Sequence, residues 1–253
     1  MAKILFNTAN LVARFSGYRL IDADWGAHER KTIESTTDAE FAKICAEIKA
    51  TGFDALELWI AHCHPSKVTV EGAKVRRKIA ADHGLSVDAL ACAYTRDHLA
   101  VAEALGVSCI NGGLWGTDLA SVKELVKASS VAYNYENHPE KTPREILQRI
   151  EGGSEKIGVA LDTGWIGISG LVEAAEFIDV LGGLLRHVHL KDVEKRGSHS
   201  TVKLGTGCVG IEGVIARMKA GGYAGMWSWE DEPEARNPTL IAAEMREYIS
   251  ARL

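Results

Sequence analysis

The stretch Ile157-Gly158-Val159-Ala160-Leu161-Asp162 is an apolar run of strand composition that ends in a carboxylate. Three further segments in the second half of the chain are also hydrophobic runs that end in a potential metal ligand: residues 131–136, 185–189 and 225–230, which end in Glu136, His189 and Glu230. Helix-like sequence separates each segment from the next. In a (β/α)8 barrel all strands run in the same direction, so residues at their carboxyl ends meet at one mouth. The four segments therefore predict an α/β fold of this kind, with two Glu, one Asp and one His gathered at the mouth.

The first half of the chain supplies the remaining units of the barrel. Strand-like segments at residues 3–9, 54–60, 86–93 and 107–111 are each followed by helix-like sequence. Thr37 is placed to cap the first predicted helix, because Glu40 follows it at the spacing of a capping box. Continuous apolar strands that alternate with amphipathic helices are typical of a parallel sheet covered by helices. Eight such units favour a single closed barrel, and no glycine-rich dinucleotide-binding motif follows the first strand.

Two connections of this barrel are expected to be irregular. One runs from the first strand through Trp25 and Arg30, and the other lies between His189 and Gly210. After the strand that ends at Asp162, the next helix is expected over residues 171–181. The chain has no evident linker or low-complexity tract, and 253 residues suit one (β/α)8 domain, so residues 1–253 are expected to form a single domain.

The composition disfavours several classes of protein. The formal net charge is −5 and no long run of Lys or Arg occurs, which disfavours nucleic acid as the main partner. No apolar stretch reaches membrane-spanning length, and the N-terminal apolar run is too short for a signal peptide. A cytoplasmic location without a membrane partner is therefore expected. The five cysteines are scattered, odd in number and without a Cys-x-x-Cys pair, which predicts buried, reduced thiols.

Each of the four strand-end residues has an ordinary structural explanation when it is taken alone. A Glu after a strand is often solvated, Asp162 could cap a helix, and a lone His is more often structural than a ligand. Their matching positions in successive strands favour a shared site instead. This mixture of oxygen and nitrogen donors suits a hard to borderline divalent cation. His187 shares a strand face with His189 but is expected to lie lower in the barrel.

Three other histidines are expected near the same mouth. His62 and His64 follow the second strand, and such a His-x-His pair could hold a second ion. Only Cys63 accompanies the pair, so a substrate contact or a catalytic role is favoured over a second metal site. His138, two residues after Glu136, could bind substrate or orient a ligand carboxylate, and a loop-fixing contact beside Pro139 is its alternative.

Lysine and tryptophan residues complete the set of candidates at the mouth. Lys191 and Lys195 could neutralise a substrate phosphate or oxyanion, although lysines on loops are usually solvated. Trp115 and Trp165 offer flat faces against which a sugar ring could pack, and both could equally belong to the core. Glu57 points from the second strand, where it could line the barrel, and has no assigned role.

Several short motifs of the chain resemble the xylose-isomerase-like TIM barrel superfamily. This sugar phosphate isomerase/epimerase group includes tagatose 3-epimerase, inosose dehydratase and hydroxypyruvate isomerase relatives. The motifs follow the order of that family along nearly the whole chain: Gly52-Phe53-Asp54-Ala55-Leu56-Glu57-Leu58, Glu136-Asn137-His138-Pro139, Leu161-Asp162-Thr163-Gly164, His187-Val188-His189-Leu190-Lys191-Asp192, Leu204-Gly205-Thr206-Gly207, Gly221-Gly222-Tyr223-Ala224-Gly225 and Trp229-Glu230. As a set they are specific for the superfamily and for no single reaction.

The resemblance implies a ligand set and two proton-transfer residues. Glu136, Asp162, His189 and Glu230 would bind one divalent cation, with Mn2+ as the expected ion and Mg2+, Co2+ or Zn2+ as alternatives. In the resembled epimerases the two ligand glutamates also move protons, which implies catalytic roles for Glu136 and Glu230. The resemblance further implies a small-molecule sugar substrate, and barrels of this group often associate, so a homo-oligomer is a possible state.

The implied reaction begins with removal of a proton next to a carbonyl. A divalent ion that chelates neighbouring substrate oxygens would polarise the carbonyl and stabilise an enediolate. Re-protonation then gives epimerisation or isomerisation of a small sugar or keto-sugar. Expulsion of a β-hydroxyl or glycosidic oxygen would instead make the protein a dehydratase or lyase for an inosose or 3-keto-glycoside. This second outcome stays open because Trp165 replaces a second His that the epimerases often have, and Lys195 replaces an Arg.

Two classes of function outside this chemistry rank lower. Abasic-site endonucleases share the barrel but need a trinuclear zinc site and a basic surface for DNA, which nine His and a net charge of −5 do not supply. A non-enzymatic sugar-binding or scaffold role would predict that a ligand is missing, whereas all four are present.

Overall fold

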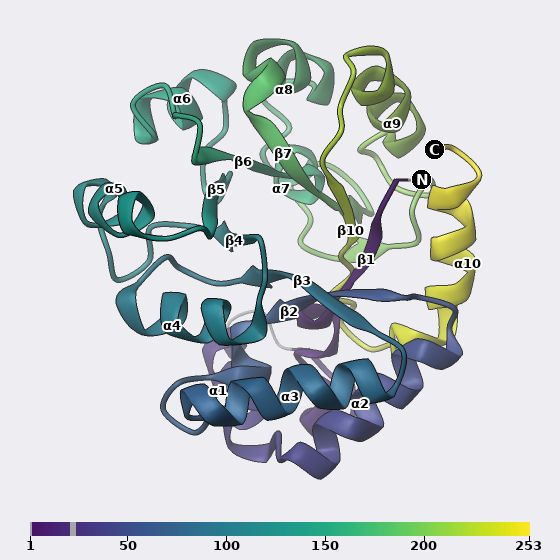
Figure 1. Cartoon of the computed structure of the whole chain (residues 1–253). Coiled ribbons are helices and arrows are strands. Elements are labelled where there is room, and N and C mark those ends of the chain that lie inside the picture. The colour runs from purple at the N-terminus through teal and green to yellow at the C-terminus, as the bar shows by residue number, and fades with distance from the viewer. Residues whose placement is uncertain (1, 21–23) are drawn as a thin grey trace.

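The computed structural model describes residues 2–20 and 24–253 of the chain. Its parallel strands form a closed barrel surrounded by helices (Figure 1). In spatial order the strands are β1 (Ile4–Asn7), β10 (Met226–Trp229), β7 (Leu185–Leu190), β6 (Ile157–Asp162), β5 (Ala132–Glu136), β4 (Cys109–Gly112), β3 (Ser86–Ala91) and β2 (Ala55–Trp59), and β2 closes on β1. The predicted (β/α)8 barrel is confirmed.

An outer layer of helices covers the strands, and most of them lie where the sequence predicts. They are α2 (Asp38–Ala50), α3 (Val70–Asp82), α4 (Arg96–Leu105), α5 (Leu119–Ala128), α6 (Pro143–Arg149), α8 (Ala174–Leu181), α9 (Ile211–Ala220) and α10 (Thr239–Ser250). As expected, Thr37 caps α2, because its side chain accepts a hydrogen bond from the backbone N–H of Glu40. No helix among residues 2–20 and 24–253 combines the length and apolarity needed to cross a membrane.

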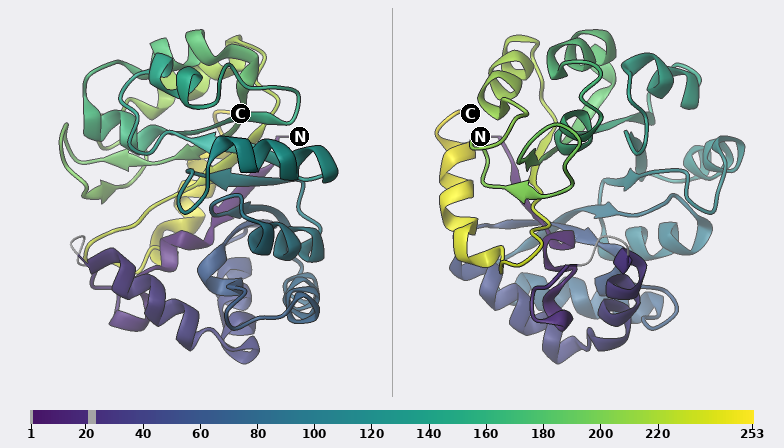
Figure 2. Two further views of the ribbon diagram at one scale, coloured as in Figure 1. Left: turned by 90° about the vertical axis from the view of Figure 1, so that its left-hand side faces the viewer. Right: turned by 180° about the vertical axis from the view of Figure 1, so that it is seen from behind.

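Three connections contain more regular structure than the sequence suggested. The segment after β1 holds the 3-10 turns η1 (Thr8–Leu11) and η2 (Arg14–Ser16) and the helix α1 (Trp25–Ser35). A short helix, α7 (Thr163–Ser169), begins directly after Asp162, where a loop was expected. The connection after β7 forms an antiparallel hairpin of β8 (Asp192–Val193) and β9 (Thr201–Val202), which lies over the barrel in the view from behind (Figure 2). Two further 3-10 turns are η4 (Ile60–Cys63) and η5 (Gly182–Leu184).

The prediction that all cysteines are buried is wrong for one of them. Cys45, Cys63, Cys92 and Cys109 are buried and free, but Cys208 is free and exposed. Cys45 lies on α2, Cys63 on η4 and Cys109 on β4, and Cys92 directly follows β3, whereas Cys208 lies in the loop that leads to α9.

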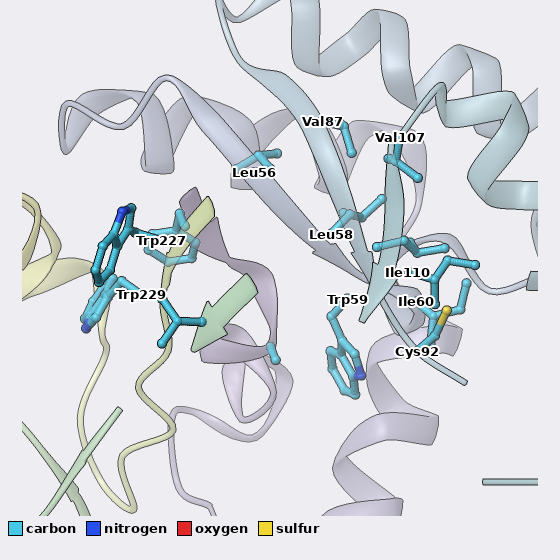
Figure 3. Packing of buried hydrophobic residues seen from close by; sticks show 14 of the residues in the cluster. Leu56, Leu58, Trp59, Ile60, Val87, Cys92, Val107, Ile110, Trp227 and Trp229 are labelled. Atoms are coloured by element: carbon cyan, nitrogen blue, oxygen red, sulfur yellow. The ribbon is translucent and has the colours of Figure 1, made fainter. Parts of the chain in front are cut away.

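Apolar side chains pack between the strands and the helices. Leu56, Leu58, Val87 and Ile110 are almost wholly buried side chains of β2, β3 and β4 in this layer (Figure 3). Nearby, the ring of Trp229 on β10 stacks on Phe53, which precedes β2, with ring centroids 6.1 Å apart. This packing fixes the strands and therefore the positions of the side chains that end them.

The interior of the barrel changes from apolar to polar toward the mouth. A small buried cluster of Leu5, Ala55, Ala89 and Cys109 fills the amino end. Alternate residues of a strand point to the same side, so the next inward residues lie one level nearer the mouth. Most of them are polar and buried, and these include Glu57, Asn111, Asn134, His187 and Ser228. Above them lie the residues at the carboxyl ends of the strands, which form the candidate site.

Loss of one helix cap is expected to weaken the fold measurably. Thr142 and Glu145 form a capping box before Pro143, since Thr142 Oγ1 accepts from the Glu145 N–H and Glu145 Oε2 accepts from the Thr142 N–H. Thr142→Ala is expected to lower the free energy of unfolding by about 1 kcal/mol, measured by urea denaturation. Gln148→Ala, an exposed change on the same helix, should stay within about 0.5 kcal/mol. Equal losses for the two variants would contradict the capping role.

Candidate metal centre

The four predicted ligands come together at the carboxyl end of the barrel. Glu136 ends β5, Asp162 ends β6, His189 lies in β7 and Glu230 directly follows β10. Their ligand atoms lie within 4.8 Å of one another. His189 Nδ1 lies 2.9 Å from Glu136 Oε1 and 3.1 Å from Glu230 Oε2. Three carboxylates and one imidazole therefore face one small volume.

Asparagine side chains from two other positions hold this group in place. Asn7, at the end of β1, donates from Nδ2 to Glu230 Oε2 at 2.9 Å. Asn137 accepts from the Asp162 N–H at 2.7 Å and donates to the Asp162 carbonyl at 2.9 Å. Neither residue stands out in the sequence as a candidate for the site. Their signal in the sequence is weak, because an amide after a strand is common in loops.

The two carboxylate oxygens of Asp162 have different surroundings, because one caps a helix and the other faces the candidate metal site. Oδ1 accepts from the N–H groups of Gly164 and Trp165 and so caps α7. Oδ2 is buried without a hydrogen-bond partner among residues 2–20 and 24–253, and lies 3.8 Å from Lys191 Nζ. Burial raises the pKa of Asp162 and Lys191 opposes this, while Glu230 and Glu136 add to it. A divalent cation would give this oxygen a partner, so the residues present fit a hard to borderline ion.

Lys191 places a buried positive charge beside the four ligands. Its Nζ lies 2.9 Å from Glu230 Oε1 and 2.7 Å from Glu232 Oε2. Burial alone would lower the pKa of Lys191, but Glu230 and Glu232 outweigh burial and raise it well above its usual value. Lys191 is therefore held as an ammonium ion. Glu230 contacts the ammonium through Oε1 and the imidazole of His189 through Oε2.

A second buried group lies one level below the ligands. Glu57 Oε2 lies 2.8 Å from His187 Nε2 and 3.0 Å from His189 Nε2, and Oε1 accepts from Asn111 Nδ2 at 2.7 Å. Burial would raise the pKa of Glu57, but the two imidazoles outweigh it and hold the pKa well below its usual value. His187 thus lies lower in the barrel, as expected. The sequence signal for Glu57 was a carboxylate inside the apolar strand Ala55–Trp59.

A profile described as Xylose isomerase-like TIM barrel matches residues 45–251 of the chain. The chain belongs to this family. A comparison with curated protein sequences finds no match. The resemblance that the motifs indicated is therefore confirmed at the level of the family.

Solved structures of the same fold include proteins with different activities in their descriptions. A xylose isomerase-like TIM barrel protein from Mycobacterium smegmatis, in complex with magnesium, is 17% identical with a TM-score of 0.73, over 100% of this chain and 96% of the other. D-allulose 3-epimerase from Methylomonas sp., in complex with D-allulose, is 16% identical with a TM-score of 0.70, over 100% and 97%. The probable 3-DHS dehydratase of petrobactin synthesis from Bacillus anthracis is 15% identical with a TM-score of 0.66, over 99% of each chain. At these identities the likeness shows the fold alone.

Aromatic rings line one side of the mouth in this xylose isomerase-like barrel. The rings of His138 and Trp165 lie with their centroids 3.9 Å apart, and Trp115 meets His138 edge-on at 5.4 Å. His199 approaches the other end of this row, 5.5 Å from Trp165. Burial lowers the pKa of His138, so its ring favours the neutral form. The structure thus brings His138, Trp165 and Trp115 together, and Trp115 is about half exposed.

The other predicted substrate contacts lie outside the metal group. His62 is wholly buried, with Nε2 3.2 Å from the Thr8 carbonyl oxygen and Nδ1 3.3 Å from Thr36 Oγ1. Burial lowers the pKa of His62 to about 3, and the ring has no exposed atom for a substrate. His64 Nδ1 lies 2.7 Å from Ser66 Oγ. Lys195 is exposed in the hairpin, and neither His62 nor His64 belongs to a group of potential metal ligands in the described part of the chain.

Proposed function

We propose that the protein is a divalent-metal-dependent isomerase or epimerase of a small sugar or keto-sugar. The observation that carries the proposal is the group of Glu136, Asp162, His189 and Glu230, whose ligand atoms lie within 4.8 Å at the barrel mouth. Membership of the xylose isomerase-like family supports it, as do relatives of the same fold described with a bound sugar and with magnesium. Mn2+ is the proposed ion, with Mg2+, Co2+ or Zn2+ as alternatives.

Proton transfer is proposed for the two glutamates of the group. When bound, the ion would polarise a substrate carbonyl and make the adjacent C–H more acidic. Glu136 ends β5 and Glu230 follows β10, and these strands are separated in the barrel by β6 and β7, so the two carboxylates enter the site from different sides. One carboxylate removes the α-proton and the other returns a proton. Return to the opposite face of the same carbon gives an epimer, and return to the neighbouring carbon gives an aldose or ketose isomer.

One observation favours elimination as a second candidate reaction. The Lys191 ammonium is buried beside Glu230, and so a proton donor lies next to a proposed base. In an elimination, the base takes the α-proton, the bond from the β-carbon to oxygen breaks, and the departing oxygen takes a proton from Lys191. The product then has a double bond conjugated with the carbonyl. An inosose or a 3-keto-glycoside would be the substrate of such a dehydratase or lyase, and a probable dehydratase has the same fold.

Proton exchange in D2O tests both reactions at once. The metal-loaded protein is incubated with sugars, inososes and 3-keto-glycosides, and the C–H signals are followed by NMR. Deuterium in a re-formed sugar is the expected result and would support an isomerase or epimerase. An unsaturated or cleaved product would replace this proposal with the elimination. Absence of both across the panel, with metal binding measured, would contradict the proposed substrate class.

The lysine is expected to contribute strongly to turnover, as the proton donor of an elimination or as the partner that holds Glu230 in an isomerisation. Lys191→Met keeps the length of the side chain and removes the ammonium, and we expect kcat to fall by about 100-fold, as for loss of a positioned proton donor. Lys195→Met removes an exposed ammonium of the same connection and should change kcat by less than about twofold. If Lys191→Met still exchanges the substrate α-hydrogen for deuterium but forms no product, Lys191 acts in the elimination step. Unchanged kcat in Lys191→Met would exclude a role in turnover.

A further inference from the structure

The carboxylate of Glu57 contacts the ligand imidazole on the side away from the metal group. His189 Nε2 lies 3.0 Å and 3.1 Å from the two oxygens of Glu57, while His189 Nδ1 faces Glu136 and Glu230. Glu57 is wholly buried on β2, across the barrel from β6, the strand that ends in Asp162. The ring of His189 therefore lies between Glu57 on one side and the metal-group carboxylates Glu136 and Glu230 on the other.

The two ring nitrogens of a neutral imidazole have different roles. One carries a proton and donates a hydrogen bond, and the other offers the lone pair that binds a metal ion. A carboxylate below Nε2 accepts the N–H from that nitrogen and leaves the lone pair on Nδ1. The geometry at His189 thus directs the lone pair toward the three carboxylates of the metal group.

Two further side chains fix the position of Glu57 itself. His187 Nε2 lies 2.8 Å from Glu57 Oε2, and Asn111 Nδ2 donates to Oε1 at 2.7 Å. Asn111 is in turn held by Asn134, which donates to its Oδ1 at 2.8 Å. The carboxylate consequently receives hydrogen bonds from three buried residues and has no freedom to turn away from His189.

These contacts indicate that Glu57 binds His187 and His189 by hydrogen bonds and does not hold a second metal ion with them. Glu57, His187 and His189 together have the composition of a metal site. However, each nitrogen is at direct hydrogen-bond distance from the carboxylate, and all three residues are buried. Asn111 Nδ2 also donates a hydrogen bond to Glu57 Oε1. An oxygen that accepts from an amide N–H fits a hydrogen-bond acceptor rather than a metal ligand.

We infer that Glu57, supported by His187 and Asn111, is a positioning residue that keeps the proton of His189 on Nε2 and so prepares Nδ1 to bind the divalent ion. The inference rests on the proposed function in one respect, namely that an ion binds the group of Glu136, Asp162, His189 and Glu230. It goes beyond that proposal because Glu57, which would not touch the ion, is what sets the orientation of the His189 ring and the nitrogen that carries its proton.

Histidine NMR tests the inference without reference to activity. In the 15N-labelled protein loaded with diamagnetic Zn2+, long-range 1H–15N spectra are expected to show His189 protonated at Nε2 and metal-bound at Nδ1. The metal-free protein is expected to carry a proton on Nε2 as well. Zn2+ on Nε2, or a metal-free ring without a proton there, would overturn the inference, and this measurement needs no variant.

Metal affinity provides the second readout. Glu57→Gln keeps the size of the side chain but leaves one carbonyl oxygen for two imidazoles, and we expect the Zn2+ dissociation constant to rise by about 10- to 100-fold in calorimetry. Ser228→Ala is the matched control, since Ser228 is buried at the same level of the barrel as Glu57, pairs with His189 in the sheet register and has an Oγ without a hydrogen-bond partner among the described residues. The control should bind Zn2+ within about twofold of the wild type.

The outcomes separate this inference from the proposed function. Equal affinity in Glu57→Gln and the wild type would contradict the role of Glu57 while leaving the metal site intact. Two Zn2+ ions per chain in the wild type, with one lost in Glu57→Gln, would replace the support by a second metal site. Failure of the wild type to bind Zn2+, Mn2+ or Mg2+ would contradict the proposed function, whereas a proton on Nε2 in that protein would still uphold the contact with Glu57.

Discussion

Glu230→Gln is expected to slow the exchange of a substrate α-hydrogen with solvent deuterium by about 1000-fold, the scale of a lost general base. The variant keeps the shape of the side chain, and its carbonyl oxygen still accepts a hydrogen bond from Asn7 or Lys191. What it loses is the basic carboxylate. The rate is measured by NMR in D2O with the Mg2+-loaded protein and the panel compound that the wild type exchanges. Glu136→Gln is expected to behave in the same way.

The neighbouring carboxylate provides the control for this experiment. Glu232 also contacts the Lys191 ammonium, but it does not belong to the group of potential metal ligands. Glu232→Gln should therefore slow exchange by less than about tenfold, the effect of a change in the surroundings of Lys191. Thermal unfolding of all three variants reports on the fold. Wild-type exchange in Glu230→Gln would show that another group removes the proton.

The sequence was sufficient to predict the barrel and the meeting of Glu136, Asp162, His189 and Glu230 at its mouth, because both depend on local pattern. Asp162 and Glu136 each end a strand, and in a parallel barrel the ends of strands converge. The position of a residue along its strand thus gives its height in the barrel. His189 and His187 illustrate this, since their spacing of two placed one near the mouth and the other one level below.

The supporting contacts could not be predicted because they join segments far apart in the chain. Glu57 meets His187 across the interior of the barrel, and Asn7 reaches Glu230 from the opposite end of the sequence. Which inward residues face one another depends on the register of closure, and no local pattern specifies it. The environment of Lys191 could not be predicted for the same reason. A loop lysine is usually solvated, but here the ammonium is buried and pairs with Glu230 and Glu232.

Two local features differ from what the sequence suggested, for a different physical reason. The strand ending at Trp59 is followed by the 3-10 turn η4, which turns His62 inward, where Thr8 and Thr36 bind its ring. A His-x-His pattern carries no information about such a turn. The helix expected over residues 171–181 is present as α8, but the short helix α7 before it was missed, because residues 163–169 include two glycines, are largely hydrophobic and so lack an amphipathic pattern.

Asp162→Asn is expected to reduce affinity for Mn2+ by more than about 100-fold, because loss of a direct ligand should exceed the 10- to 100-fold cost of losing an outer partner. The substitution is informative because Asn retains the carbonyl oxygen that caps α7 through Gly164 and Trp165, and replaces the oxygen without a partner by an amide. Mn2+ binding is measured by the electron paramagnetic resonance signal of the free ion.

The control is the same Asp-to-Asn substitution at a helix-capping residue that is not a proposed metal ligand. Asp118 caps α5 by accepting from the Ser121 N–H at 2.7 Å and lies on the surface. Asp118→Asn should leave Mn2+ binding unchanged. At Mn2+ concentrations about 100 times the wild-type dissociation constant, the wild type and Asp118→Asn should gain about 2.7 kcal/mol of stability from the bound ion. Asp162→Asn should gain almost none at that concentration, and an equal gain would mean that the ion binds without Asp162.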